Sequence, residues 1–293
     1  PKHILELPKK TKVIFDFSDA YLAENILSIR GIFRGLIKYT TGASSKFYFN
    51  YKKAFIDILN RSDNVICSSP EQAKLIEQYC DNISIILDAH FDECFNLKKR
   101  FNLSKVINIG WEGQHATLPS LLSLMKKISK TSLAPFVHYH IVTDNKTKQL
   151  DKLRYGFSMN QYFANTDFPI SFYPWSLASM NNLTEICDFA IVPVNINSKI
   201  HVFKPENRLH LFWRMGLPVI TSATESNVRA MKKCGHDLYA DSIDDWVRLI
   251  KRLNSSSDNI LFYSKSALNY INTNFTPEYF KSIWIESITK AIN

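Results

Sequence analysis

Apolar and polar positions along the last two thirds of the chain follow two alternating periodicities. Short runs rich in β-branched and aromatic residues predict buried strands, and the segments between them carry apolar residues at helical spacing. The predicted strands are KVINIGWEG (105–113), FVHYHIVTD (136–144), ISFYPW (170–175), DFAIVPVN (188–195) and LPVITS (217–222). Strands that alternate with helices in this way predict a parallel sheet with helices on both faces.

The helices predicted between these strands differ in how clearly they begin and end. TLPSLLSLMKKI (117–128) has a marked apolar stripe, and ESNVRAMKKCG (225–235) ends at a glycine, which is typical of helix C-termini. Further helices are predicted from Lys146, through Leu183, up to Gly216 and over DDWVRLIKRL (244–253), and NSSSDN (254–259) is predicted to be a loop.

The first hundred residues show the same alternation of predicted strands and helices less completely. The strands predicted there are KVIFDFSD (12–19), DNVICSS (63–69) and ISIILDAH (83–90). The last helix, PEYFKSIWIESITKAI (277–292), has an apolar stripe of Phe280, Ile283, Trp284 and Ile288. We therefore expect a partial Rossmann-like domain over 1–102 that ends in a linker, a complete one over 103–275, and a C-terminal helix over 276–293 that packs back on the first domain.

Composition narrows the classes of protein that fit. The chain has 293 residues, of which 45% are hydrophobic, enough for two domains with separate cores. Its five cysteines are widely spaced and form no CxxC pair, which predicts reduced thiols and no metal site. The sequence contains no run of about 18 apolar residues and no signal-peptide pattern in PKHILELPKKTK, so we expect a cytoplasmic protein. The start at Pro1 suggests a fragment or a processed product.

The net charge of +9 favours acidic partners. Nucleic acid is not among those expected, because the charge is dispersed along the chain and no recognised binding motif is present. Residues 25–56 contain six cations, no acid and many aromatic residues, a pattern that suits a peripheral contact with an anionic membrane surface or a lipid phosphate. An ordinary solvated helix face above a core would give the same pattern.

The residues that could bind or act on a ligand are expected directly after the predicted strands. In a parallel sheet, ligands bind at the carboxyl ends of the strands. After the first strand of the second domain comes GWEGQHAT, in which Gly110 and Gly113 would let the backbone approach a ligand. The next helix would offer its N-terminal amides to a phosphate, although an ordinary turn would look the same. The three-glycine dinucleotide pattern and the P-loop are both absent, which argues against a dehydrogenase or an ATPase.

A second cluster begins the stretch KPENRLHLFWRMGLPVITS (204–222). Lys204 and Arg208 lie four residues apart near a predicted helix start, where they would share one helical face. Cations at that place oppose the helix dipole, which suggests that they hold something negative, such as a departing diphosphate. The alternative is a solvated basic turn in which Glu206 pairs with a neighbour.

The second half of the chain resembles the donor-binding domain of GT-B glycosyltransferases, in particular the retaining group that uses nucleotide-sugar donors. The matching motifs, in the family's order, are IGWEGQHATL, FYPWS, DFAIVPVN, KPENR, MGLPVITS and DDWVRLIKRL. FDFSD and the segment from Ser62 to His90 resemble the later part of the acceptor domain. The resemblance implies an α/β fold of two Rossmann-like domains whose parallel sheets face a cleft, with the N-terminal domain incomplete.

The resemblance also implies roles for individual residues. Lys204 and Arg208 would contact the donor diphosphate and stabilise it as it leaves. The implied donor-binding residues are Gly110, Trp111, Gly113, Gln114, Pro193, Glu206, Asn207, Ser222 and Glu225. The acids expected to face the cleft from the first domain are Asp16 and Asp19, which could instead cap the next helix. No metal, no other cofactor and no protein nucleophile would be needed, and the acceptor would be a glycan or a lipid-linked molecule.

The same stretch departs from the family in one respect. Many relatives carry two glutamates eight residues apart on this element, and the chain has Phe203 and Leu211 in those places. The second glutamate normally holds the nucleotide ribose, so a non-catalytic subunit that binds a nucleotide or a partner is the alternative to an enzyme. A sugar-nucleotide epimerase would need further acids in the cleft. His90 or His115 could orient an acceptor or a sugar, whereas His138 and His140 are expected to be structural.

Overall fold

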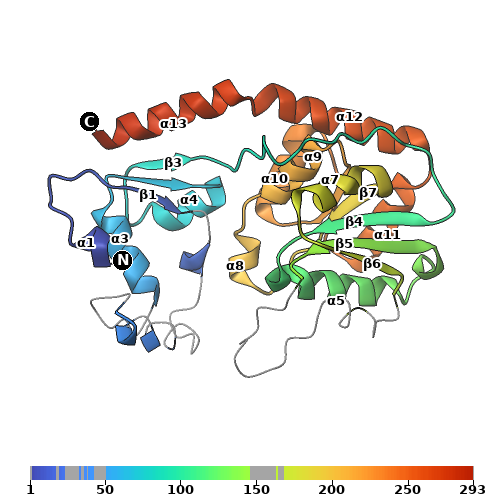
Figure 1. Ribbon diagram of the computed structural model, residues 1–293, viewed down its shortest axis with the longest axis horizontal. Coiled ribbons are helices and arrows are strands. Elements are labelled where there is room, and N and C mark those ends of the chain that lie inside the picture. Colours follow the sequence, from blue (N-terminus) through green and yellow to red (C-terminus); the bar gives the residue numbers. More distant parts are fainter. Residues whose placement is uncertain are drawn as a thin grey trace. The chain divides into compact units, whose positions relative to one another are not determined.

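The computed structural model describes residues 2–17, 20–23, 33, 36–37, 39–42, 51–145, 163 and 168–292. The chain forms two compact units. The smaller unit comprises Pro1–Ala89, Ile196–Pro205 and Thr276–Asn293, and the larger unit comprises His90–Asn195 and Glu206–Phe275. Figure 1 labels many of the helices and strands of both units.

The smaller unit is built on a three-stranded parallel sheet in the order β1-β2-β3. Its strands are β1 (Ile14–Phe17), β2 (Asn64–Cys67) and β3 (Ile83–Ile85). The central strand β2 is buried along its whole length, as expected of a parallel strand covered on both faces. Within the described part of this unit, the helices with defined bounds are α1 (Lys2–Leu5), η1 (Tyr21–Ala23), α3 (Tyr51–Arg61), α4 (Pro70–Ile76), α8 (Lys199–Val202) and α13 (Pro277–Ile292).

Helix α13 joins the smaller unit through a buried polar contact with β2. Asn64 Nδ2 donates to both the carbonyl and the hydroxyl oxygen of Ser287, each at 2.8 Å. This contact sets which face of α13 turns inward: the buried residues are Phe280, Ser287 and Ala291, whereas Trp284 and Ile288 are exposed. The apolar stripe predicted for this helix was therefore wrong at two of its four positions.

The larger unit is built on a six-stranded, fully parallel sheet in the order β6-β5-β4-β7-β8-β9. The strands are β4 (Ile107–Glu112), β5 (Val137–Thr143), β6 (Ile170–Pro174), β7 (Phe189–Val192), β8 (Val219–Ser222) and β9 (Tyr239–Ala240). In chain order this is 3-2-1-4-5-6, the doubly wound Rossmann arrangement, whose strand order reverses between β4 and β7. The predicted parallel α/β fold is confirmed.

The helices of the larger unit, within its described residues, are η2 (His115–Thr117), α5 (Leu118–Ile128), η3 (Ala134–Phe136), α7 (Leu177–Ile186), α9 (Asn207–Arg214), α10 (Glu225–Cys234), α11 (Ile243–Leu253) and α12 (Ser257–Asn274). Four of them, α7, α10, α11 and α12, begin at residues whose side chains cap them. Ser176 and Ser242 each form a capping box at the start of α7 and α11. Helix α10 ends at Gly235, whose φ of 77° lies in the left-handed region that glycine adopts easily.

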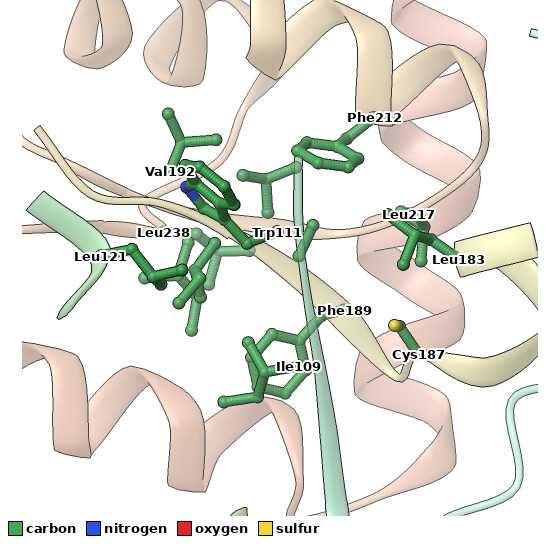
Figure 2. Close-up of a cluster of buried hydrophobic side chains, with 14 of the residues drawn as sticks. Ile109, Trp111, Leu121, Leu183, Cys187, Phe189, Val192, Phe212, Leu217 and Leu238 are labelled. Carbon is green, nitrogen blue, oxygen red and sulfur yellow. The ribbon is translucent and has the colours of Figure 1, made fainter. Parts of the chain in front are cut away.

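Large apolar side chains of β4 and β7 form the core together with residues of the surrounding helices. Figure 2 shows Trp111 and Phe189 among Leu121 of α5, Leu183 of α7 and Phe212 of α9. Each of these five side chains is fully buried. Burial of one such side chain contributes about 1.5–3 kcal/mol relative to exposure, so this cluster fixes β4, and with it the residues that follow β4.

The division between the units differs from the expected domain boundary. Residues 90–102, expected to close the first domain, belong to the larger unit. The reason lies in Lys98, which is buried: its Nζ donates to the carbonyl of Cys187 at 2.7 Å, and its amide donates to the carbonyl of Met215 at 3.0 Å. The segment therefore contributes to the packing of the larger unit.

Several predicted elements changed or lie outside the described residues. The predicted loop 254–259 is non-helical only over 254–256; α12 begins at Ser257, where the hydroxyl of Ser256 accepts from the amide of Asn259 at 3.1 Å. The helix predicted from Lys146 and most of segment 25–56 lie outside the described residues. The five cysteines are all free. Across the part of the chain that is described, no helix combines the length and hydropathy that crossing a membrane requires.

Candidate functional site

The reversal of strand order between β4 and β7 marks where a ligand of this fold would bind, at the carboxyl ends of the strands. A pocket of about 140 Å³ lies in the larger unit near this edge of the sheet, beside the ends of β4 and β6 and the start of α9. It is lined by His90, Glu93, Glu112, Trp175, Met180, Asn207, Arg208 and Leu211. The pocket therefore has an ionisable part, made of two acids, a histidine and an arginine. Its other walls are two apolar side chains, a tryptophan and an amide.

Arg208 is the cation of this pocket. It is the second residue of α9, so its position is fixed by the buried helix residues that follow it, among them Leu209 and Phe212. One guanidinium nitrogen donates to the hydroxyl of Thr117 at 3.0 Å, and the guanidinium carbon lies 5.8 Å from the ring centroid of Trp111. Burial lowers the pKa of Arg208, while the opposite charge of Glu112 raises it. The group remains a cation at neutral pH.

Gly113 makes the position of Arg208 possible. A β-carbon at residue 113 would lie 2.7 Å from Cζ2 of Trp111 and 2.9 Å from both a guanidinium nitrogen of Arg208 and the hydroxyl of Thr117. Each of these separations is too short for carbon in contact with another heavy atom. We expected Gly113 to make room for a ligand, and the structure shows that it makes room for Arg208 against Trp111.

Glu112 ends β4 and carries an acceptor into the pocket. Trp175, directly after β6, donates from its indole nitrogen to Glu112 Oε1 at 3.1 Å. Burial raises the pKa of Glu112, and the charge of Arg208 is the largest influence opposing it. Sequence reasoning missed Glu112 as a site residue, although its place at the end of a strand was a usable signal. Trp175 itself is about half exposed.

His90 lines the same pocket and is held by its neighbour Glu93. The ring nitrogen Nδ1 lies 2.5 Å from Glu93 Oε2. The backbone of His90 has a φ of 55°, and its Nε2 is buried with no hydrogen-bond partner within the described residues. His90 was one of two histidines proposed from sequence to orient a sugar or an acceptor. The other, His115, begins η2 and does not line this pocket.

The structure separates the two basic residues that the sequence grouped. Helix α9 begins at Asn207, so Lys204 precedes the helix and does not share a helical face with Arg208. Pro205 explains the late start: proline disfavours the helical conformation for the residue before it. Lys204 belongs to the smaller unit and Arg208 to the larger one. Asn207 does line the pocket beside Arg208.

Several predicted donor-binding residues are occupied with structural contacts. Glu206 is buried and forms a bidentate pair with Arg229 at 2.8 and 2.9 Å, so its carboxylate is directed to α10. The hydroxyl of Ser222 accepts from the amide of Val194 at 2.9 Å. Trp111 is fully buried in the core.

Gly110 is also explained by packing. It lies inside β4, and a β-carbon there would meet Cys187 Sγ at 3.1 Å. Pro193 is buried directly after β7. Gln114, which precedes η2, and Glu225, the first residue of α10, are exposed. Gly110, Pro193, Gln114 and Glu225 are not among the residues that line the described pocket.

The acids predicted for the first domain lie in the smaller unit or outside the described residues. Asp16 is on β1 and exposed, and partial burial, followed by the nearby charge of Asp88, raises its pKa. Asp19 lies outside the described residues. His138 and His140 form the structural contacts expected of them: His140 bonds Tyr173 and Asn108 at 3.1 and 3.0 Å. No group of three or more His, Cys, Asp or Glu side chains in the described ranges is arranged to hold a metal ion.

Comparison with known proteins shows a shared fold without close sequence similarity. No protein-family model and no curated protein sequence matches the chain. Among solved structures, TarM is similar with a TM-score of 0.64 at 14% identity, over 97% of this chain and 51% of TarM. A point mutant of S. aureus TarM, in complex with fondaparinux, alpha-GlcNAc-glycerol and UDP, has a TM-score of 0.58 at 14% identity, over 83% of this chain and 47% of the mutant.

WaaG, a glycosyltransferase involved in lipopolysaccharide biosynthesis, is similar with a TM-score of 0.58 at 9% identity, over 96% of this chain and 75% of WaaG. These likenesses give the chain the fold of GT-B glycosyltransferases. The chain spans about half the length of TarM. The described pocket therefore lies in the unit whose sheet has the full doubly wound order of that fold.

Proposed function

We propose that the protein is a glycosyltransferase that moves a sugar from a nucleoside-diphosphate donor to a glycan or lipid-linked acceptor, with retention of configuration and without a metal ion. The observation that carries this proposal is Arg208, a guanidinium held by Thr117 and Trp111 near the carboxyl end of β4. That place in a doubly wound sheet is where such folds bind nucleotides. The presence of UDP in the similar structure of the TarM mutant supports a nucleotide as the ligand.

The chemistry assigned to Arg208 is stabilisation of the leaving group. When the bond between the anomeric carbon and the diphosphate oxygen breaks, negative charge develops on the diphosphate. A positioned guanidinium stabilises that charge more strongly in a partly buried site than in water. The acceptor oxygen bonds to the anomeric carbon on the same face, and its proton passes to the departing diphosphate oxygen. This route requires no protein nucleophile.

Thermal shift with UDP, GDP and ADP tests the donor site. A nucleotide present at about 100 times its Kd stabilises the folded state by about 2.7 kcal/mol. For a unit of about this size that corresponds to a rise in Tm of roughly 5–10 °C. Absence of a response to all three nucleotides, with the protein folded, would refute the proposed donor site.

Arginine variants test the role of the guanidinium. Arg208→Ala is expected to lower the affinity for the responding nucleotide at least tenfold and to abolish sugar transfer. Arg248→Ala is the matched control, because Arg248 is an exposed arginine of the same unit that pairs only with Asp245 among the described residues. Lys204→Ala is measured beside them, because its role in the diphosphate site is also proposed. Equal activity of Arg208→Ala and Arg248→Ala would remove Arg208 from the mechanism.

The acceptor and its location need a separate test. We propose that residues 25–56 bring the enzyme to an anionic membrane surface at the cytoplasmic face, where a lipid-linked acceptor would lie. Flotation with vesicles containing phosphatidylserine should recover the protein at low salt and release it at high salt, since surface charge attraction is screened. Equal recovery with neutral vesicles would contradict this part of the proposal.

A nucleotide-binding protein without catalysis is the alternative that these measurements separate. The observation in its favour is Leu211, an apolar side chain that lines the pocket where many relatives place a glutamate. Nucleotide binding together with no hydrolysis or transfer from any nucleotide sugar would support that alternative. Turnover of a single nucleotide sugar would exclude it.

A further inference from the structure

A second pocket, of about 320 Å³, lies in the smaller unit at the amino ends of its strands. Its walls come from the segments that precede the three strands and from the last turn of α13. They include Lys12 before β1, Asn60 and Asp63 before β2, Asp81 before β3, and Lys290 of α13. Ligands of doubly wound folds bind at the opposite, carboxyl ends of the strands. This amino-edge pocket is therefore a different kind of site from the one that holds Arg208.

Hydrogen bonds around Asp63 hold the walls of the amino-edge pocket in place. Asp63 Oδ2 accepts from the amide of Val13 at 2.8 Å, and this bond lowers the pKa of Asp63. The side-chain amide of Asn82 donates to the carbonyl of Asp63 at 3.0 Å, and the thiol of Cys80 donates to the carbonyl of Asn82 at 3.3 Å. The segments before β1, β2 and β3 thus share one network. A ligand would meet walls that are already ordered, which lowers the entropic cost of binding.

The charges at the amino-edge pocket balance. Its lining includes two lysines and two aspartates, namely Lys12, Lys290, Asp63 and Asp81. The neighbours that pair with this lining add one charge of each sign, because Arg61 lies 3.8 Å from Asp63 and Glu286 lies 2.8 Å from Lys290. A phosphate or a polyamine would meet repulsion as well as attraction in these surroundings. The pocket therefore suits a polar ligand without net charge.

Three side chains of the lining have hydrogen-bonding capacity left for a ligand. Asn60, Tyr79 and Asp81 have no side-chain hydrogen bond to any other described residue. Asn60 offers a donor and an acceptor, Tyr79 a hydroxyl that can be either, and Asp81 two acceptor oxygens. The ring of Tyr79 packs against the core of the smaller unit, and it joins an apolar body to a polar tip. Hydroxyl groups, which both donate and accept, match this set, and the C–H face of a sugar ring matches the tyrosine.

We propose that the amino-edge pocket binds a neutral oligosaccharide, whose hydroxyls bond Asn60 and Asp81 and one of whose rings lies on Tyr79. The volume is at the lower end of the roughly 300–1,000 Å³ found for small-molecule sites. This inference goes beyond the proposed function, since it requires neither Arg208 nor a nucleotide. In a glycosyltransferase the site would hold a glycan by a part that is not being modified.

A double variant, Asn60→Ala with Asp81→Ala, tests the proposal. Both side chains are exposed and make no hydrogen bond within the described residues, so Tm should not change. Binding is measured by surface plasmon resonance on immobilised oligosaccharides of glucose, galactose, mannose and N-acetylglucosamine. At least one should bind the wild type. The double variant should bind it roughly tenfold more weakly, because two hydrogen bonds are lost.

Gln78→Ala is the matched control, since Gln78 is exposed next to Tyr79 and does not line the pocket. It should keep the wild-type Kd. Tyr79→Phe keeps the ring and removes the hydroxyl, so it should lose less affinity than the double variant. A double variant that binds the oligosaccharide as tightly as the wild type would overturn the proposal, because the saccharide would then lie elsewhere.

Two further results would also overturn the saccharide site. One is a folded wild type that binds none of these oligosaccharides. The other is a rise in Tm with glutamine, a zwitterion that also has no net charge, in the absence of oligosaccharide binding. Arg208→Ala should keep the oligosaccharide affinity, and the double variant should keep the thermal response to nucleotides. Failure of the saccharide site and failure of the proposed function are therefore separate results.

Discussion

Gly113→Ala introduces one methyl group at the point where β4, η2 and α9 meet. The new carbon would lie 2.7 Å from Trp111 Cζ2 and 2.9 Å from both Arg208 and Thr117. The guanidinium can move, because it ends a flexible side chain, but Trp111 is fully buried and cannot move without disturbing the core. Overpacking of this kind costs about 1–3 kcal/mol. Loss of the hydrogen bond from Arg208 to Thr117 adds about 0.5–1.5 kcal/mol.

The two costs together are about 1.5–4.5 kcal/mol, so the variant should unfold at a Tm lower by roughly 3–18 °C, at about 2–4 °C for each kcal/mol. Its response to nucleotides should fall as well, because the guanidinium is displaced. Gly110→Ala is the matched control on the same strand. Its new carbon would meet Cys187 Sγ at 3.1 Å, and its three nearest atoms belong to Cys187 and Phe189, not to Arg208. Gly110→Ala should lose some stability and keep the nucleotide response.

A double-mutant cycle with Arg208→Ala separates the two contributions. Removing the guanidinium relieves one of the three close approaches, so the two substitutions should not be additive in the free energy of unfolding. Circular dichroism melts and urea titrations give these free energies. The packing argument is refuted if Gly113→Ala melts with the wild type and binds nucleotides equally well.

Three other perturbations test parts of the structure away from the pocket. Asn64→Ala should lower the free energy of unfolding by about 2–3 kcal/mol, because the buried oxygens of Ser287 lose their donor; urea titration would measure it, and wild-type stability would contradict it. Burial, and then His138, lowers the pKa of His140 to about 4 from 6.5, so only the unfolded state gains this proton between those pH values. Stability should fall by about 1.4 kcal/mol per pH unit as pH decreases through that window; His140→Gln should flatten the slope, and an unchanged slope would exclude His140 as its source. Glu206→Ala should cost about 2–4 kcal/mol by leaving Arg229 without its carboxylate, and adding Arg229→Ala should recover part of the loss in the same titration.

Much of the fold follows from periodicity because the strands of a parallel sheet are buried on both faces. FAIV and VITS, the strands β7 and β8, are buried at every residue and stand out as short apolar runs. Helix α12 was not predicted, since polar residues occur in each of its turns. Its inward face uses Ser264 and Ala267 beside Ile260 and Ile271. Strand β9 has two residues, too few for a period to appear.

The site was predictable only in part, because its members come together through the fold. Arg208 was identified from its place after a strand and the charge around it. Glu112 and Trp175 are 63 residues apart, and nothing in either segment alone signals the hydrogen bond between them. Glu206 was expected to face the donor, and only tertiary structure reveals Arg229 as its partner.

The discontinuity of the smaller unit has a consequence for how the chain acquires its structure during synthesis. The ribosome releases β1, β2 and β3 before the strands of the larger unit. Asn64 can then bond Ser84 of β3, but its two hydrogen bonds to Ser287 form only when α13 appears. The larger unit, which ends at Phe275, can complete its sheet before that moment. Synthesis at about 5–20 residues per second gives the early strands many seconds without α13. Of the two units, the one whose strands are made first is thus the one that finishes folding last, and during this interval it would depend most on chaperones.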